Sequence, residues 1–395
     1  MLVHNVNIIG TQGLTDIRIR NEKIGDVFTA GAKPNQKDEL SLSFHQAIAF
    51  PGLINSHDHL DFNLFPQLGN KIYKNYTEWG KDIQVTNKEE ISRVLQIPLP
   101  LRVQWGIYKN LLNGITTVVN HGKLLPIKEE LITVFQRSRS LHSPAFEKNW
   151  KWKINFSFTK DRPFVIHLGE GTDEAANREI DSFIKWNIFK RKVVAIHGVA
   201  MSKRQASAFR ALIWCPASNY FLLNKTAAVN TLSTQVSTML GTDSTLTASW
   251  NLWDHLRLAR KEKMISDEGL MNMLTSIPAN NWGLDNCGKI AAGQQADIVV
   301  AADKNGMKGM NLFYALNPED LLMVIHKGNI RLFDERLLDQ LNNAQFPLAG
   351  FSKIALNGKV KYVEGDLPGL MQRIRKYYPA VEFPISASRS AQSIA

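Results

Sequence analysis

A chain of 395 residues exceeds a typical single domain, so we expect one unusually large barrel or a large core with a smaller companion. Apolar residues make up 44% of it, and no stretch approaches the roughly 18 uninterrupted apolar residues of a membrane span, which excludes a membrane protein. The net charge of +11 comes from dispersed Lys and Arg without a nucleic-acid reader motif. We therefore expect no nucleic-acid partner, and the surplus charge favours anionic ligands.

The predicted secondary structure changes type twice along the chain. Residues 2–31 alternate short apolar runs with Gly and Asn turns, which predicts small antiparallel strands. From about residue 47 to 245, apolar strands alternate with helical segments, which predicts parallel pairing and a sheet covered by helices. Short strands return after residue 285. The simplest architecture pairs the two terminal β segments beside a central barrel.

Eight strands are expected in the central region, the number that a (β/α)₈ barrel requires. Two of them are residues 138–143 and the alternating segment from Trp150 to Phe158. The interval 143–163 is short for a full strand and helix, so a helix over residues 147–158 is the alternative. The other six are the apolar runs AIAFPGLIN, ITTVVNHG, PFVIHLGEG, VVAIHGVA, ALIWCPASN and STMLGTDST.

A pair of histidines follows the first of these strands, in FPGLINSHDHLDF. Residues two apart in an extended chain point the same way, so His57 and His59 project together while Asp58 faces elsewhere. That geometry is typical of a metal chelate, although the same pattern alone is more often two ordinary loop histidines.

Further ligand-type residues stand at the ends of other strands. His167 ends PFVIH, His197 ends VVAIH, and Asp243 follows TMLGT. In a parallel barrel these ends converge at one mouth, where active sites lie. A single strand-end His or Asp more often satisfies a neighbouring carbonyl or caps a helix, but the whole set at one rim predicts a metal site.

The chemistry expected there is hydrolysis. Imidazoles and a carboxylate suit Zn²⁺, or alternatively Fe²⁺, and leave a position open for water, which becomes a nucleophile near neutral pH. Breaking a carbon–nitrogen bond also needs a proton for the leaving nitrogen. Glu170, three residues after His167, is the candidate proton shuttle; the alternative is a carboxylate at the approach to a helix.

At this point the motifs resemble a known family. PGLINSHDHL, GITTVVNHG, IHLGEG, IHG, CPASN, GTDS and GKIAAGQQADIVV, in this order, resemble the amidohydrolase superfamily in its cytosine-deaminase and chlorohydrolase-like branch. The resemblance implies an α/β fold: a distorted (β/α)₈ TIM barrel with a small β-sandwich built from both termini. The expected boundaries are 1–48 and 286–365 for the two sandwich parts, 49–285 for the barrel, and 366–395 for a C-terminal extension.

The resemblance also assigns roles, residue by residue. It implies that Asp243 also accepts a proton from the water and that His197 contacts the nucleophile or the tetrahedral oxyanion. The third and fourth barrel units appear abbreviated, because only 108 residues separate His59 from His167. The expected set is His57, His59, His167 and Asp243 for one divalent metal; Glu170, His197 and Asp243 for catalysis; and His121, His142, Ser218 and Asn219 for substrate.

Several alternatives stay open. A binuclear site would require a carbamylated lysine, for which Lys153 and Lys160 are the candidates. The expected activity is deamination of an amino-substituted N-heterocycle; opening of a cyclic amide, loss of another leaving group, or an inactive scaffold are the rivals. Only Cys215 and Cys287 occur, without CxxC spacing, and the start resembles no secretion signal, so we expect a cytoplasmic protein. A homodimer is common in the family.

Overall fold

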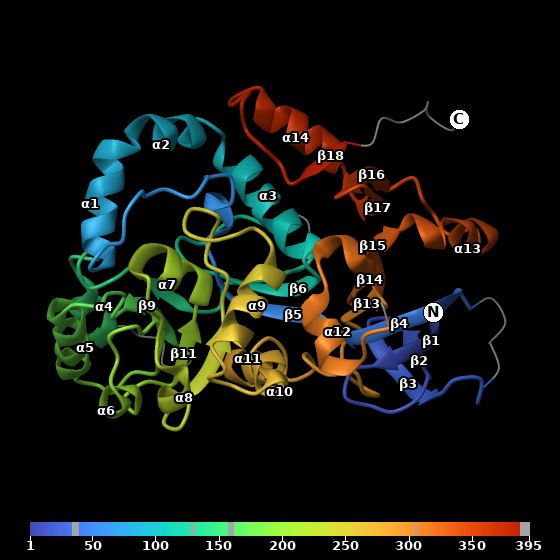
Figure 1. Cartoon of the computed structure of the whole chain (residues 1–395), viewed down its shortest axis with the longest axis horizontal. Coiled ribbons are helices and arrows are strands. Elements are labelled where there is room, and N and C mark those ends of the chain that lie inside the picture. The colour runs from blue at the N-terminus through green and yellow to red at the C-terminus, as the bar shows by residue number, and fades with distance from the viewer. Residues whose placement is uncertain (34–38, 128–130, 157–161, 305, 388–395) are drawn as a thin grey trace.

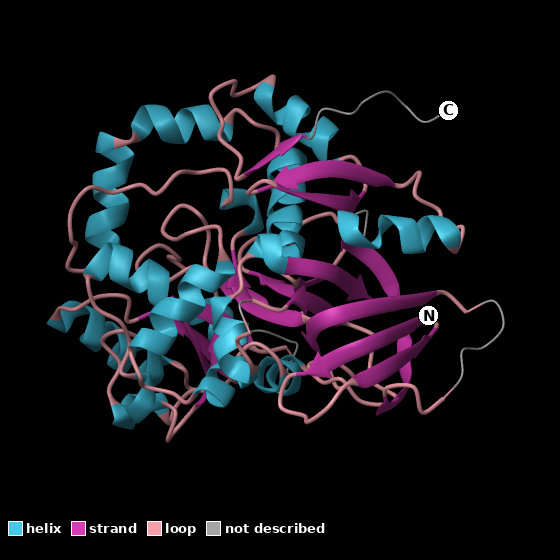
Figure 2. Ribbon diagram, turned by 45° about the vertical axis from the view of Figure 1, so that its right-hand side comes forward, coloured by secondary structure: helices cyan, strands magenta, loops and turns pink. Residues whose placement is uncertain are grey.

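The computed structural model describes residues 1–33, 39–127, 131–156, 162–304 and 306–387. Segments from both ends of the chain form one ten-stranded sheet, whose strands lie on the right-hand side of Figure 2. Its order is β18-β16-β17-β15-β14-β13-β4-β1-β2-β3. The strands are β1 (Leu2–Ile8), β2 (Thr15–Arg20), β3 (Lys23–Thr29), β4 (Ser41–Pro51), β13 (Ile298–Ala302), β14 (Leu321–His326), β15 (Asn329–Asp334), β16 (Phe351–Leu356), β17 (Lys359–Glu364) and β18 (Ile385–Ala387).

The two terminal segments meet where β4 pairs with β13. This ladder is antiparallel, from Ile298 opposite Pro51 to Ala302 opposite Ala47, whereas β1 and β4 are parallel. The expected pairing of the terminal β segments is therefore present. The C-terminal extension also contributes, since β18 pairs with β16. The division of this sheet into the two layers of a sandwich stays a prediction.

Eight parallel strands form the central region, in two described sheets. One has the order β5-β6-β7 and the other β12-β11-β10-β9-β8. The two sheets approach each other where the backbone N–H of Asp243 donates to the carbonyl of His57 (3.0 Å). Gly241 permits this approach, because a Cβ there would lie 2.7 Å from the Cβ of His57. The strands are β5 (Leu53–Asp58), β6 (Ile115–Asn120), β7 (Thr133–Phe135), β8 (Arg139–Leu141), β9 (Phe164–Leu168), β10 (Val193–His197), β11 (Ala211–Trp214) and β12 (Ser237–Leu240).

One predicted strand is wrong. The segment Trp150 to Phe158 forms helix α4 over Trp150–Asn155, and its last two residues lie outside the described part of the chain. Trp150 and Ile154 are buried while Trp152 is 63% exposed, so the apolar residues follow a helical spacing of four. The sequence did not indicate β7, whose three residues are too few to show an alternation.

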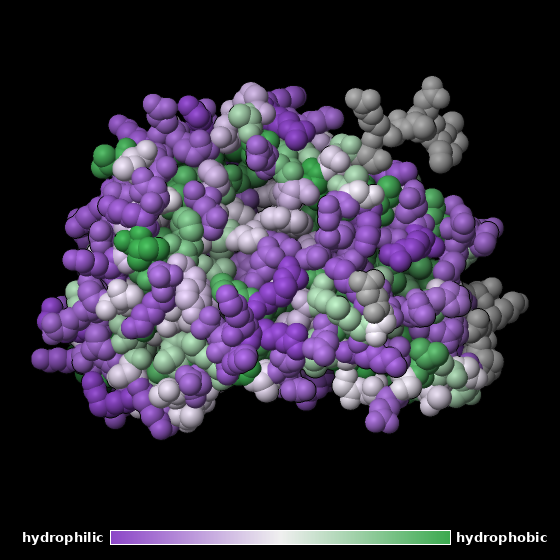
Figure 3. Space-filling view, viewed as in Figure 1, coloured by the Kyte–Doolittle hydropathy of each residue, from purple (hydrophilic) through white to green (hydrophobic). Residues whose placement is uncertain are grey.

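The helices cover the parallel strands and the region above them (Figure 1). Residues 136–138 alone separate β7 from β8, too few for a crossover between neighbouring parallel strands, so these two short strands follow one another as parts of one interrupted strand, β7 beside β6 and β8 beside β9. The region is thus abbreviated, as predicted. Among the described residues, no helix is long and apolar enough to cross a membrane. The face in Figure 3 is mainly hydrophilic with small scattered apolar patches. The remaining helices are η1 (Leu60–Phe62), α1 (Tyr76–Thr86), α2 (Lys88–Leu95), α3 (Leu99–Leu112), α5 (Glu174–Trp186), α6 (Lys203–Ala206), α7 (Pro216–Leu223), α8 (Val229–Leu232), α9 (Leu252–Lys261), α10 (Asp267–Asn272), α11 (Ser276–Trp282), α12 (Gly309–Ala315), η2 (Pro318–Asp320), η3 (Glu335–Leu337), α13 (Leu338–Asn343) and α14 (Leu367–Arg375).

Candidate metal centre

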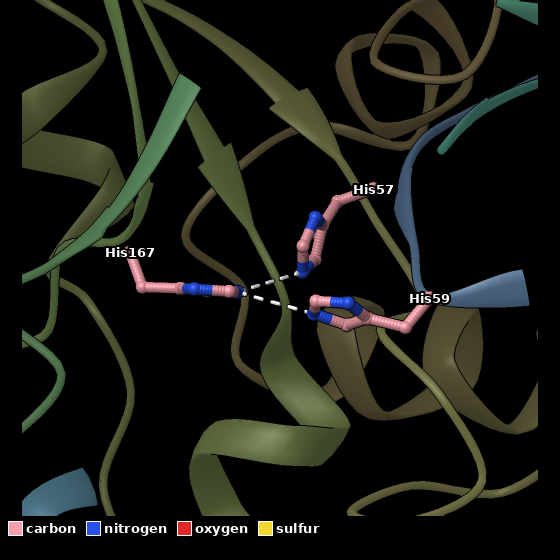
Figure 4. A group of neighbouring side chains, drawn as sticks. All are labelled: His57, His59 and His167. Carbon is pink, nitrogen blue, oxygen red and sulfur yellow. Dashed lines mark hydrogen bonds between the residues drawn. The ribbon is translucent and has the colours of Figure 1, made fainter. Parts of the chain in front are cut away.

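The site lies where the parallel strands end. His57 is the penultimate residue of β5 and His59 follows that strand, while His167 lies near the end of β9. Their Nε2 atoms point toward one another from two different sheets (Figure 4). The Nε2 of His167 is 3.3 Å from the Nε2 of His57 and 3.3 Å from the Nε2 of His59.

This spacing fits a metal ion. Two nitrogens bound to a tetrahedral zinc at about 2.0–2.1 Å from the ion are about 3.3 Å apart. A hydrogen bond explains at most one of the two contacts of His167, because its Nε2 carries one lone pair or one proton. Buried neutral imidazoles converging on one point therefore fit a divalent cation as their common partner.

Asp243 lies beside these nitrogens, three residues beyond the end of β12. Its Oδ1 is 3.6 Å from the Nε2 of His57 and 3.8 Å from that of His59. Its Oδ2 is fixed from behind by the hydroxyls of Ser218 (2.8 Å) and Thr247 (2.9 Å), which both donate to it. Burial opposes ionisation, but the surrounding imidazoles, His57 foremost, hold the pKa of Asp243 well below its usual range. An ionised carboxylate thus faces the histidines.

The backbone is in the left-handed region at two site residues, His197 (φ 70°) and Asp243 (φ 57°). His197 pairs with Leu168 and not with His167, so regular strands would place the His167 and His197 side chains on opposite faces. The turn at His197 instead stacks its ring on that of His167, with centroids 5.3 Å apart. Strained backbone of this kind concentrates at functional sites.

Burial favours the neutral form of His59, His167 and His197. It is the largest cause lowering the pKa of His59 to about 4 and that of His197 to about 3, with the neighbouring His57 adding to the effect in both. The pKa of His167 is also well below its usual value, first through burial and then through the surrounding imidazoles. Neutral imidazole is the form that binds a metal.

A backbone hydrogen bond selects the tautomer of His167. Its Nδ1 lies 2.8 Å from the carbonyl of His142, which can only accept. The proton of His167 therefore sits on Nδ1, and the lone pair of Nε2 points at the nitrogens of His57 and His59. Metal-binding histidines are usually oriented in this way. His142 thus contributes through its carbonyl, whereas its ring contacts the hydroxyl of Ser143 (3.3 Å).

Glu170 is 6% exposed, and its Oε1 lies 3.5 Å from the Nε2 of His197. Burial raises the pKa of this carboxyl well above its usual value, and the charges of Asp243 and Glu179 raise it further. Glu170 and Asp243 are therefore two carboxyl groups driven in opposite directions, one protonated and one ionised. A site with this separation can donate a proton at one place and accept one at another.

A chain of hydrogen bonds fixes the tautomer of His197 as well. The indole N–H of Trp214 can only donate, and it donates to the hydroxyl of Thr226 (2.6 Å). That hydroxyl then donates to Oδ1 of Asn219 (3.3 Å), which leaves the amide nitrogen of Asn219 to donate to Nδ1 of His197 (2.9 Å). The proton of His197 consequently sits on Nε2, the atom that faces Glu170.

Of the four predicted substrate contacts, His142 has been placed above, and the other three divide into two groups. His121 is 3% exposed, its ring centre is 4.5 Å from that of His167, and neither of its nitrogens has a hydrogen-bond partner among the described residues. Ser218 and Asn219 instead lie in the first turn of α7, fully buried behind Asp243 and His197. The helix starts at Pro216, directly after β11 and Cys215.

The binuclear alternative finds no support at Lys153, which lies in α4 and pairs with Glu147 (2.7 Å). Lys160 lies outside the described residues.

The sequence did not reveal the polar network directly beneath the histidines. Asp58, between His57 and His59, is fully buried, and its Oδ2 accepts from Nζ of Lys109 (3.0 Å) and from the amide of Asn110 (2.8 Å). Lys109 is 1% exposed. The available signal was a lysine and an asparagine in the middle of α3, a helix otherwise rich in buried apolar residues.

Comparisons with known proteins agree with this geometry. Residues 144–331 match the model of the amidohydrolase family, a span that includes His167, His197 and Asp243. No curated protein matches the chain in sequence.

Solved structures with the same fold share little sequence. An adenosine deaminase from Xanthomonas campestris with bound zinc is 14% identical, with a TM-score of 0.71 over 96% of this chain and 98% of that one. Atrazine chlorohydrolase TrzN from Arthrobacter aurescens TC1, complexed with zinc, is 16% identical, with a TM-score of 0.67 over 87% and 99%. Aminofutalosine deaminase from Helicobacter pylori, in complex with methylthio-coformycin, is 13% identical, with a TM-score of 0.62 over 83% and 99%. The family match over residues 144–331 agrees with the resemblance in the motifs, and the solved structures show that the chain shares their fold.

Proposed function

We propose that the chain is a mononuclear metal-dependent hydrolase that deaminates an amino-substituted N-heterocycle. The observation that carries the proposal is the convergence of three Nε2 atoms, with 3.3 Å from His167 to each of the other two and the ionised Asp243 beside them. His57, His59, His167 and Asp243 would hold one divalent ion. Zn²⁺ is the first choice, because the donor set suits it and both the adenosine deaminase and TrzN were crystallised with zinc. Fe²⁺ is the alternative.

A bound metal would supply Lewis acidity, which lets water act as a nucleophile near neutral pH. Asp243, whose carboxyl is held toward the ionised form, can accept a proton from the attacking water. Glu170 is protonated and can deliver a proton to the leaving nitrogen, which cannot depart as an anion. His197 carries its proton on Nε2, so it donates a hydrogen bond to the oxygen that forms on the substrate carbon. The two unpartnered nitrogens of His121 are the groups left to bind the heterocycle.

A panel assay tests this function. The zinc-loaded protein is incubated with aminopurines, aminopyrimidines, aminopterins and aminotriazines, and released ammonia is measured. Ammonia from at least one class is expected. Silence across the panel from protein with one metal per chain would count against deamination.

The rival activities use the same groups. Chlorohydrolysis is favoured as the second candidate by the similarity to TrzN, and chloride release from a chlorinated triazine distinguishes it. Cyclic amide opening would appear as loss of ring absorbance without ammonia. An inactive scaffold would hold less than about half a metal ion per chain after loading, since a site that has lost its function need not keep its affinity.

The finer architecture belongs to the same proposal. We infer a closed, distorted (β/α)₈ barrel over residues 49–285 and a β-sandwich from residues 1–48 and 286–365, followed by the extension 366–395. A cytoplasmic location, a homodimer and the absence of a nucleic-acid partner remain predictions from the sequence.

A further inference from the structure

A second cavity lies at the opposite end of the parallel strands from the metal centre. It has a volume of about 640 Å³, within the range of small-molecule sites. Pro163 lines it immediately before β9, whereas His167 stands near the other end of that strand. At about 3.3 Å per residue, the strand separates the two places by roughly 13 Å. A ligand in this cavity would not touch the metal ligands.

Cations line the cavity from neighbouring strands. Arg162, Lys192 and Arg210 stand one or two residues before β9, β10 and β11, which pair side by side in this order. Adjacent strands are about 4.8 Å apart, so these positions line one edge of the sheet. Arg137, just after β7, also lines the cavity, as does Lys327.

None of the described residues that line the cavity is an Asp or a Glu. Within the described part of the chain, no carboxylate forms an ion pair with Arg137, Arg162, Lys192 or Arg210, and Arg210 only donates to the carbonyl of Asn281 (3.0 Å). These four side chains are exposed, and an anion bound among them would lower the repulsion between their like charges.

Neutral groups complete the lining. Thr117 is 1% exposed, and its hydroxyl has no hydrogen-bond partner among the described residues, which is costly for a buried polar group. The amide nitrogen of Gln295 donates to Asp297 (2.9 Å), which leaves one of its two hydrogens for a ligand. An apolar side is formed by Phe135 and Trp282, whose rings lie 5.4 Å apart, together with Leu284.

We propose that this cavity binds a nucleotide carrying two or more phosphate groups, at a site separate from the metal centre. The row of cations spans several strands, which suits a polyphosphate better than a single phosphate, and guanidinium groups bind phosphate oxygens in pairs. The apolar side accommodates the base. This inference does not depend on the proposed hydrolysis, because none of its residues contacts the metal centre.

Isothermal titration calorimetry of the full zinc-loaded chain in 150 mM salt tests the proposal. The probes are ATP, inorganic pyrophosphate and adenosine. ATP is expected to bind, pyrophosphate to bind at least about tenfold more weakly, and adenosine to give no measurable heat. Absence of ATP binding, or equal affinity for ATP and pyrophosphate, would overturn a nucleotide site.

A matched pair of variants separates a specific site from general attraction. Lys192→Ser with Arg210→Ser should weaken ATP binding by at least tenfold. The control, Lys185→Ser with Lys203→Ser, removes the same charge from exposed positions on α5 and α6 outside the cavity. Thermal melting of both variants verifies folding. An equal loss in the control pair would show non-specific anion binding and overturn the proposal. A second check, Thr117→Val, changes no charge and is expected to weaken ATP binding several-fold.

Discussion

Two buried polar clusters adjoin each other in this protein, one around Asp58 and one made of histidines. They differ in whether their polar atoms have hydrogen-bond partners. In the cluster beneath the site, Asp58 accepts from Lys109, Asn110 and Asn63, and Asn55 accepts from the backbone N–H groups of His57 and Thr242. In the histidine cluster, Nδ1 of His57 and both nitrogens of His121 have no partner among the described residues.

The difference separates structure from function. A buried network whose groups are all hydrogen-bonded makes a backbone rigid. Buried groups without partners cost free energy, and they persist where a ligand supplies the missing partner. The Asp58 network therefore holds the chain at residues 57–59 in place, and the histidine cluster is the part that receives metal and substrate. Each of the following predictions tests one side of this contrast.

Removing a metal ligand should have the largest effect. His57→Ala deletes one of three converging Nε2 atoms, so the bound metal, measured by elemental analysis after dialysis, should fall below about a tenth of an ion per chain, and turnover should be lost. His45→Ala is the matched control, since His45 is exposed on β4. Full metal content in His57→Ala would remove His57 from the centre.

A substitution at Glu170 tests proton transfer separately from metal binding. Glu170→Gln keeps the size of the side chain but cannot transfer a proton, so metal content should be unchanged while turnover falls by at least about a hundredfold. Glu174→Gln, at an exposed position in the first turn of α5, is the control. Unchanged turnover in Glu170→Gln would show that the raised pKa of this carboxyl serves no step of the reaction.

Substitutions in the Asp58 network should act on the stability of the protein. Lys109→Met leaves the Asp58 carboxylate buried without its cation and should lower the free energy of unfolding by about 3–5 kcal/mol. Adding Asp58→Asn removes the unpaired charge, so the double variant should be more stable than Lys109→Met alone. Urea denaturation measures both. Additive losses would mean that the ion pair is not the unit that supports His57 and His59.

The sequence predicted much of this arrangement because its signals are local. His57, His167, His197 and Asp243 each follow an apolar run, and the carboxyl ends of parallel strands meet at one edge. What it missed depends on contacts between distant segments. Lys109 acquires its role only when α3 packs beneath β5, and Trp150 to Asn155 forms a helix because its alternate apolar residues pack every fourth position. Likewise, the hydrogen bonds of Ser218 to Asp243 and of Asn219 to His197 depend on the start of α7 at Pro216.

The smallest effect should come from breaking the series of hydrogen bonds that orients His197. This series tests the contrast because it links fully hydrogen-bonded groups to a histidine of the proposed active site. Thr226→Val removes the hydroxyl between Trp214 and Asn219, so the amide can rotate and the proton of His197 is no longer confined to Nε2. We expect kcat to fall about tenfold with KM little changed, as one hydrogen bond made in the transition state is lost, and Thr226→Ser to restore it. The ¹⁵N chemical shifts of His197 in the zinc-loaded protein report the tautomer directly. A shift pattern of an Nε2–H imidazole in Thr226→Val would show that something other than this chain of hydrogen bonds fixes the proton.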